Sequence, residues 1–280
     1  MLKKDNLFGE LLAEFVGAFI LIFIGAGSVA SLVLNDQAYN MWDVGLIWGS
    51  GVTMAIYITG AVSGTHINPA VTITMAAFRD FPKFKVIPYI LSQIAGCFTG
   101  ALVTYGLFRQ GFFVFEAANG IVRSAESGLT TAGIFTTYPK PYLSNIEAMF
   151  VEIAITAVLL MVILAIGDAK NTNAPNGKYA PFGPILVGLT IAILGASFGS
   201  LTGFAMNPAR DFGPKLFLAI SGWGNIALPA PNNYFWVPIV GPIVGGLLGA
   251  LIYDNLVSKY IVPTALSDGG SNTSLNQDAA

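Results

Sequence analysis

The chain has 280 residues, of which 54% are hydrophobic without counting its 32 glycines, and only 10% are charged, with a net charge of −2. Soluble domains carry about 25% charged residues, so this chain has too little charge to cover a water-facing globule of its length. It contains no long run of one charge sign, which argues against a nucleic-acid partner. Its single cysteine, Cys97, excludes an internal disulfide framework and a cysteine zinc cluster. The composition therefore predicts an integral membrane protein.

Six apolar stretches are long enough to cross a bilayer as helices, which takes about 20 residues. They are predicted approximately at Leu7 to Leu34, Val44 to Ala61, Val86 to Phe108, Ile146 to Ile166, Pro184 to Leu201 and Tyr234 to Ile252. The first stretch follows Lys3 and Lys4 as a signal peptide would, but it is too long and carries Glu10 and Glu14. We therefore interpret it as a retained transmembrane helix.

Two shorter apolar stretches, Asn68 to Phe78 and Asn207 to Ile220, are too short for a full crossing. Each begins with Asn-Pro-Ala, at Asn68, Pro69 and Ala70 and at Asn207, Pro208 and Ala209. Asparagine caps helices and proline suits the first helical turn, so both tripeptides predict helix starts. A backbone that stops inside the hydrocarbon must be satisfied by protein or by water in a cavity. The pattern therefore predicts two re-entrant half-helices whose amino-terminal ends meet beside a pore.

The chain also contains an internal repeat. Glu14 and Glu152 lie at equivalent places in two apolar helices, and each is followed by a second span and then by Asn-Pro-Ala. The third spans match at a constant offset, with Gly96, Gly100, Ala101 and Leu102 corresponding to Gly245, Gly249, Ala250 and Leu251. Three full crossings per half is an odd number, so the two halves must be inverted, which places the working site near the bilayer midplane.

The predicted fold is therefore an all-α membrane protein with six transmembrane helices and two re-entrant half-helices in an inverted repeat. We expect one domain over residues 1–260, with the repeats at about 7–108 and 146–257, and a disordered tail at 261–280. Basic residues gather on one side of the predicted topology, which is the cytoplasmic side by the positive-inside tendency. These residues are Lys3, Lys4, Arg79, Lys83, Lys85, Lys170, Lys178 and Lys259. Both termini are then cytoplasmic, and Arg109 to Ser144 and Ser221 to Asn233 face outward.

A single Asn-Pro-Ala is a weak signal because Asn-Pro is common in turns, but two copies at equivalent places are specific. Through Ser63 to Thr72 (SGTHINPAVT) and Thr202 to Asp211 (TGFAMNPARD), the chain resembles the aquaporin superfamily, the major intrinsic proteins, over roughly residues 7 to 260. The resemblance implies a passive channel without enzymatic activity or cofactor, assembled as a homotetramer in a lipid bilayer. The bacterial cytoplasmic (inner) membrane is the expected location.

Within that family, the sequence is similar to the glycerol-conducting branch, the aquaglyceroporins, rather than to narrow water channels. The positions that match its selectivity filter are Trp48, Gly195, Phe204 and Arg210. Asp211, Pro238 and Ile239 and the loop from Ser221 to Asn233 agree with this branch. The expected solutes are glycerol, small polyols and some water, with ions and protons excluded.

The same resemblance implies a ladder of backbone carbonyls along the pore. These carbonyls are expected from Gly64, Thr65, His66, Gly203, Phe204 and Ala205. The hydroxyl of Thr65, where alanine is frequent in the family, could add a donor to this ladder. Glu14 and Glu152 are costly in a membrane unless buried and hydrogen-bonded, and in the family such residues brace the non-helical loops.

Three alternatives to a glycerol channel differ in the residues that they require. A water-selective channel is the runner-up to glycerol conduction. A coupled transporter would need a titratable residue in the path, for which Glu14 and Glu152 are the only candidates. An intramembrane enzyme would need a nucleophile with a base, yet the elbow-like spacing from Gly195 to Gly199 lies in an apolar span and lacks the strand-to-helix turn. His66, the single histidine, has no second ligand beside it, so no metal site is expected.

Overall fold

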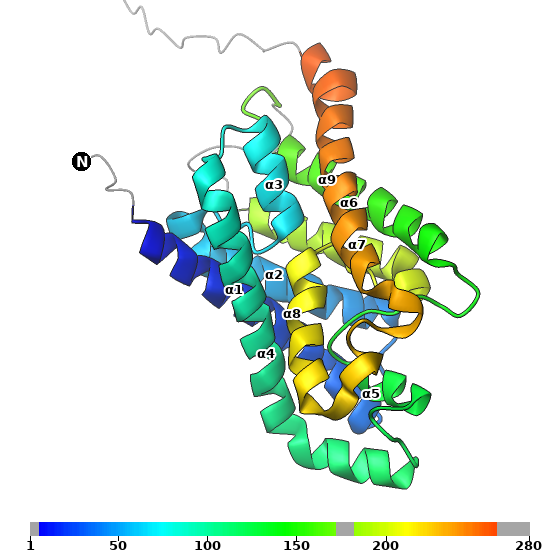
Figure 1. The fold of residues 1–280 in the computed structure, drawn as a ribbon. Helices are drawn as coiled ribbons and strands as arrows, with labels where there is room; N and C mark the ends of the chain where they lie inside the picture. The colour runs from blue at the N-terminus through cyan, green and yellow to red at the C-terminus, as the bar shows by residue number, and fades with distance from the viewer. Residues whose placement is uncertain (1–5, 172–181, 262–280) are drawn as a thin grey trace, which may run out of the picture.

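Long and half-length helices build the protein in the computed structural model, which describes residues 6–171 and 182–261 (Figure 1). The described residues contain no β-strand. The α-helices are α1 (Leu7–Leu34), α2 (Met41–Ser63), α3 (Pro69–Phe78), α4 (Lys83–Ala118), α5 (Leu129–Ala132), α6 (Asn145–Gly167), α7 (Gly183–Thr202), α8 (Pro208–Leu218) and α9 (Val237–Ile252). The tail predicted from residue 261 lies outside the described residues except for Ile261, and so do Lys3, Lys4 and Lys178.

The six predicted spans are confirmed, because six helical segments within the described residues are long and apolar enough to cross a membrane. Apart from the end of α4, the helix bounds agree with the predicted ones to within three residues. Helix α4 continues past Phe108 to Ala118, and its last turns bend away from the main axis of the helix (Figure 1). Helix α9 begins at Val237 rather than Tyr234, because the residues just before it, Pro231–Trp236, form a 3-10 helix.

Glycines at matching positions allow the same close helix packing in both repeats. A Cβ atom at Gly96 would lie 2.3 Å from the carbonyl oxygen of Phe15, and one at Gly245 would lie 2.4 Å from that of Ile153. Phe15 and Ile153 directly follow Glu14 and Glu152. Helix α4 therefore packs on α1 as α9 packs on α6, and only glycine allows the backbones to approach so closely. Equivalent contacts in both halves are what the inverted repeat predicts.

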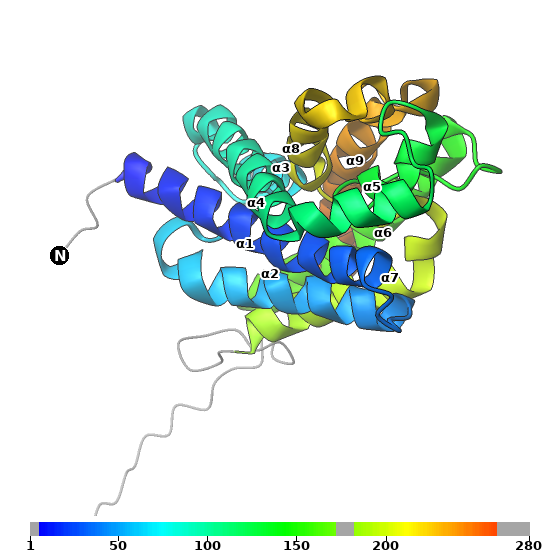
Figure 2. The same ribbon diagram turned by 90° about the horizontal axis from the view of Figure 1, so that it is seen from below.

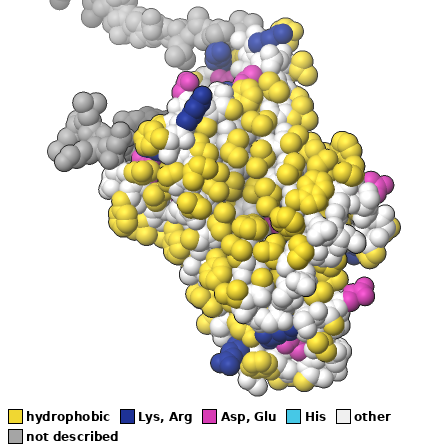
Figure 3. Space-filling view, in the orientation of Figure 1, with side chains coloured by type: hydrophobic (Ala, Val, Ile, Leu, Met, Phe, Trp, Pro, Cys, Tyr) yellow, Lys and Arg dark blue, Asp and Glu magenta, His cyan; other side chains and the backbone are white. Residues whose placement is uncertain are grey.

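The surface divides into an apolar belt and two polar ends. Hydrophobic side chains cover most of the middle of the molecule, and charged side chains lie mainly toward its ends (Figure 3). Large apolar side chains such as Phe8, Leu107 and Phe150 are more than half exposed, at 76%, 70% and 62%. Such a belt suits hydrocarbon rather than water, so the chain is an integral membrane protein.

The two ends of the molecule are the terminal face and the loop face. The terminal face carries the start of α1, the end of α9 and the turns at 79–82 and 168–171. The loop face carries the segments 119–144 and 219–236, which are joined by a hydrogen bond from the Tyr138 hydroxyl to the Ile226 carbonyl oxygen at 2.9 Å. Helices α1 and α2 run side by side between the faces (Figure 2).

Candidate solute pore

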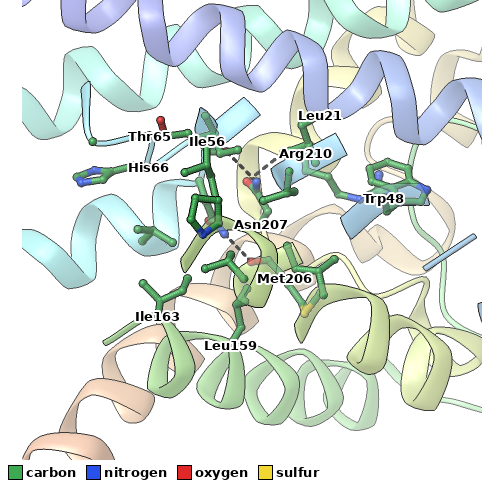
Figure 4. Close-up of a pocket in the computed structure, with 18 of the residues that line it drawn as sticks. Leu21, Trp48, Ile56, Thr65, His66, Leu159, Ile163, Met206, Asn207 and Arg210 are labelled. Atoms are coloured by element: carbon green, nitrogen blue, oxygen red, sulfur yellow. Dashed lines mark hydrogen bonds between the residues drawn. The ribbon is translucent and has the colours of Figure 1, made fainter. Parts of the chain in front are cut away.

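Three cavities lie in a row between the two faces. A central cavity of about 340 Å³ runs past the starts of α3 and α8 (Figure 4). A vestibule of about 520 Å³ opens on the loop face and shares Trp48, Phe204 and Arg210 with the central cavity. A third cavity of about 540 Å³ on the terminal face shares Met75, Ile163 and Gly167 with it. The shared side chains mark two boundaries along one path through the molecule.

The central cavity has chemically distinct walls. Transmembrane helices contribute apolar side chains, including Leu21, Ile56 and Leu159, whereas the non-helical segments 64–68 and 204–207 contribute polar groups. In Figure 4 the path runs from Thr65 and His66, past Asn207, to Arg210 and Trp48. A solute in this cavity therefore contacts both hydrocarbon side chains and hydrogen-bonding groups.

The two half-helices meet through their asparagine caps. The side-chain oxygen of Asn68 accepts a hydrogen bond from the Ala70 amide at 2.9 Å, and that of Asn207 accepts from the Ala209 amide at 3.0 Å. The side-chain amides cross between repeats, since Asn68 Nδ2 donates to the Met206 carbonyl at 2.9 Å and Asn207 Nδ2 to the Ile67 carbonyl at 2.8 Å. Each NH2 group has two donors, so one donor per asparagine remains for the cavity that both residues line.

Glu14 fixes the direction of the peptide groups before α3. Its carboxylate accepts hydrogen bonds from the amides of His66 at 2.8 Å and Ile67 at 2.6 Å. In a planar trans peptide the carbonyl points opposite to the amide N–H, so the carbonyls of Thr65 and His66 are turned away from Glu14. Ser63 and Gln93 donate to the remaining positions of the carboxylate at 2.7 and 2.8 Å.

Glu152 does the same before α8. Its carboxylate accepts from the amides of Ala205 at 3.0 Å and Met206 at 2.8 Å, which turns the carbonyls of Phe204 and Ala205 away from it. Thr202 donates a third bond at 2.6 Å. No bond of this kind directs the Gly203 carbonyl among the described residues.

The two segments share unusual backbone angles. Thr65 and Ile67 have φ of 49° and 43°, and their counterparts Phe204 and Met206 have 42° and 48°. Positive φ costs a residue with a side chain about 1–2 kcal/mol. The carboxylates of Glu14 and Glu152 offset this cost, because their hydrogen bonds hold the strained peptides in place.

Trp48, Phe204 and Arg210 form a buried corner at the boundary with the vestibule. The rings of Trp48 and Phe204 meet edge to face, with centroids 6.2 Å apart and planes at 79°. The Arg210 guanidinium carbon lies 4.0 Å from the Trp48 ring centroid, and its Nη1 donates to the Phe135 carbonyl at 2.9 Å. These side chains are at most 6% exposed, so the guanidinium has few water molecules to compete with a solute.

Gly195, the fourth predicted filter residue, lines neither the central cavity nor the vestibule. A Cβ atom there would lie 3.0 to 3.3 Å from the Phe204 ring. The ring of Phe204 thus occupies the space that a larger residue at 195 would fill.

Two further glycines at this corner were missed by the sequence analysis. A Cβ atom at Gly25 would lie 2.3 Å from the Trp48 ring, and one at Gly199 would lie 2.6 Å from the Phe204 ring. Each aromatic ring therefore rests on the bare backbone of a neighbouring helix. The glycines themselves were visible, but which rings they face depends on packing between helices that the sequence pattern does not specify.

We expect Gly25→Ala to disturb the corner, because its methyl group overlaps the Trp48 ring. Overpacking of this kind costs about 1–3 kcal/mol, and moving the ring should lower glycerol permeability together with thermal stability. Gly27→Ala on the same helix is the matched control, since a Cβ atom there meets nothing within 4 Å. Melting curves and stopped-flow permeability compare the two variants. Equal behaviour of both would show that Trp48 does not depend on Gly25.

Thr65 and His66 line the central cavity, and each has one polar side-chain atom within hydrogen-bond distance of a protein hydroxyl. The Thr65 hydroxyl lies 2.6 Å from that of Thr59, which also contacts the Ala55 carbonyl at 2.9 Å. Donation from Thr65 to Thr59 satisfies both groups and leaves no Thr65 proton for a solute. His66 Nδ1 lies 3.2 Å from the Thr72 hydroxyl, and the described residues contain no cluster of metal-ligating side chains.

Charged groups surround the mouth on the terminal face. Arg79 donates two hydrogen bonds to Asp254, and this contact raises the pKa of the guanidinium. Asp168 accepts from the hydroxyls of Ser258 at 2.6 Å and Tyr253 at 2.9 Å, and the bond from Ser258 contributes most to lowering the pKa of the Asp168 carboxyl. Both shifts favour the ionised form, so this mouth stays charged and hydrated at neutral pH.

In the described part of the chain, six helices of membrane-spanning length surround this row of cavities, which is the arrangement of a membrane channel. The model of the major intrinsic protein family matches residues 1–253. The chain belongs to the major intrinsic protein family, which confirms the predicted resemblance to the aquaporin superfamily.

Similar proteins include several uptake facilitators. The glycerol uptake facilitator protein of Escherichia coli K12 is 48% identical over 263 residues, covering 93% of this chain and 92% of the relative. That of Pseudomonas aeruginosa is 46% identical over 262 residues, with the same coverage of 93% and 92%. A propanediol uptake facilitator of Salmonella typhimurium is 45% identical over 260 residues, and the alignment covers 92% of this chain and 97% of the relative. The X-ray structure of the aquaglyceroporin from Plasmodium falciparum superposes with a TM-score of 0.80 at 30% identity, over 91% of this chain and 99% of that one.

Proposed function

We propose that this protein is a passive channel that lets glycerol and related small uncharged solutes, with some water, cross the membrane while it excludes ions and protons. The corner formed by Trp48, Phe204 and Arg210 carries the proposal. Its two aromatic faces suit the carbon chain of a polyol, and the guanidinium can donate to two neighbouring hydroxyl oxygens. Glycerol facilitators among the similar proteins support this assignment.

The hydrogen-bonding groups along the path suit the hydroxyls of the same solute. Carbonyls turned away from Glu14 and Glu152 accept hydroxyl protons, and the free amide donors of Asn68 and Asn207 serve hydroxyl oxygens. We include the carbonyls of Gly64 and Gly203 in this ladder, as the sequence implied. A neutral molecule with both donors and acceptors can thus exchange water for protein along the path.

Cations meet an unfavourable field on this path. Each half-helix places about +0.5 of a charge at its amino-terminal end, and both ends lie at the junction of Asn68 and Asn207. The Arg210 guanidinium adds a full positive charge nearby. A protonated water chain would face the same field, so protons are excluded with other cations.

We further propose that the terminal face is cytoplasmic in a bacterial inner membrane. Basic side chains on that face support the orientation by the positive-inside tendency; they are Arg79, Lys83, Lys85, Lys170 and Lys259. The exposed apolar sides of the helices support assembly as a homotetramer with one pore per subunit. The channel needs neither a cofactor nor a catalytic residue for this function.

Purified protein in liposomes tests the proposal directly. We expect stopped-flow light scattering to show glycerol entry far above that of empty liposomes, with a smaller water signal, and planar bilayers to show no ohmic current. Wild-type protein that passes water but no glycerol would contradict the glycerol assignment and leave a water channel. Steady ionic current would contradict the field argument.

A further inference from the structure

Two fully buried charged residues of α8 have no part in the pore as described so far. Asp211 and Lys215 lie one helical turn apart, are both 0% exposed, and form an ion pair with each other. Neither lines the central cavity or the vestibule. Burying two charges costs several kcal/mol per ion before pairing, so their presence directly behind Arg210 calls for a role.

Both residues bind the same short piece of the loop face. Asp211 Oδ1 accepts hydrogen bonds from the Thr136 hydroxyl at 2.5 Å, the Thr137 amide at 2.8 Å and the Thr137 hydroxyl at 2.7 Å. Lys215 Nζ donates to the Thr136 hydroxyl at 2.7 Å and to the Thr137 carbonyl at 3.2 Å. Five hydrogen bonds thus fix two consecutive residues of a segment that has no regular secondary structure.

The residue just before this piece holds the filter arginine. The Phe135 carbonyl oxygen accepts the 2.9 Å hydrogen bond from Arg210 Nη1. This carbonyl is part of the peptide group that links Phe135 to Thr136. The Phe135 ring stacks on Phe112 with centroids 5.7 Å apart and planes at 11°. The carbonyl that positions Arg210 is therefore fixed from one side by Asp211 and Lys215 and from the other by ring packing.

The arrangement of the pair also keeps the Asp211 carboxylate from neutralising the charge of Arg210. Asp211 is the sequence neighbour of Arg210, yet its carboxylate is directed to Lys215, and none of the ion pairs between described residues includes Arg210. Without Lys215, the nearest carboxylate would be left buried and unpaired, and Arg210 would be its closest cation. The guanidinium would then be drawn from the Phe135 carbonyl, and its charge would be cancelled.

We propose that Asp211 and Lys215 are positioning residues for selectivity: as an internally neutral pair they fix the Phe135 carbonyl that holds Arg210 and keep the Arg210 charge unpaired beside the path. This inference rests on the proposed function, in which Arg210 selects neutral solutes. Lys215 is its decisive member, because it cancels the charge of Asp211 and also bonds the loop.

The test compares Lys215→Met with the neutral double variant Asp211→Asn/Lys215→Met in liposomes of matched folded protein content. The ratio of glycerol to water permeability should fall about tenfold in the single variant, and a cation current should appear where wild-type protein shows none. The double variant should recover the ratio to within about twofold of wild type and show no current, because asparagine carries no charge and can still accept the Thr137 amide. Lys85→Met is the matched control, since Lys85 pairs with Glu10 at 2.9 Å away from the filter, and both readouts should stay at wild-type values.

A folded Lys215→Met channel with wild-type ratio and current would overturn the proposal, and so would a double variant as altered as the single one. Should the single variant fail to fold, Thr136→Val against Thr136→Ser tests the contact of the pair with the loop, because only serine keeps the hydroxyl between Asp211 and Lys215. The valine variant should lose selectivity and the serine variant should keep it, and equal behaviour would contradict the proposal. Wild-type protein that passes no glycerol would count against the proposed function alone, because the cation current still tests the pair.

Discussion

Replacing Gly195 with histidine and Phe204 with threonine together should lower glycerol permeability about 10- to 200-fold, while water permeability falls far less. The ring of Phe204 now fills the space above Gly195, with only 3.0 to 3.3 Å between the ring and a Cβ atom at 195. The double change removes the apolar wall and fills that corner with a polar ring. Water needs only a single-file gap and a hydrogen-bond partner, whereas glycerol needs room and an apolar surface for its carbon chain.

Stopped-flow light scattering under an osmotic step and a glycerol step measures both permeabilities on the same liposomes. The ratio is the informative quantity, because it does not depend on the amount of protein. Phe204→Thr alone is the matched comparison, since it removes the wall without filling the space; it should lose glycerol selectivity only in part. Unchanged glycerol flux in the folded double variant would show that selection takes place elsewhere along the path.

The sequence was sufficient for the architecture because a bilayer imposes simple requirements. Apolar runs of spanning length give the helices, and two short runs that start with Asn-Pro-Ala give the half-helices at Asn68 and Asn207. The same dependence on apolar runs explains why the extension of α4 from Arg109 to Ala118 was not predicted. Once a helix leaves the hydrocarbon, an apolar run is no longer required, so the pattern gives no sign of where the helix ends.

The candidate site was only partly accessible from sequence. Trp48, Phe204 and Arg210 could be named through the family resemblance, and they do meet at one boundary of the central cavity. The Phe135 carbonyl that accepts a hydrogen bond from Arg210 could not be predicted, because no residue type marks which backbone oxygen of an irregular segment will bind a side chain. Lys215 lies four residues after Asp211, a spacing that suits an ion pair on a helix, but exposed pairs share this spacing. Burial, which gives the pair its role, is set by the whole fold.

Glu14 and Glu152 decide between a passive channel and a proton-coupled transporter. Both are fully buried, at 0% exposure, and their oxygens accept hydrogen bonds from donors of the loops rather than facing the path. Glu152 bonds the Thr202 hydroxyl and the amides of Ala205 and Met206. A proton on this carboxylate would displace one of those donors. The geometry therefore favours a bracing role for the ionised group over proton transport.

Glu152→Gln should lower the melting temperature of the detergent-solubilised protein and reduce glycerol and water permeability together. The glutamine NH2 group is itself a donor, so it cannot accept the hydrogen bonds that a carboxylate oxygen accepts at that place. Each buried donor left without an acceptor costs about 1–3 kcal/mol. The Phe204 and Ala205 carbonyls then lose their direction, so both solutes are affected. Glu147→Gln, in the exposed first turn of the same helix, is the control and should change both readouts little.

A Glu152→Gln channel that melts and conducts like wild type would contradict the bracing role. Wild-type glycerol flux that follows an imposed pH gradient, and loses this dependence in folded Glu152→Gln, would instead identify Glu152 as a proton carrier.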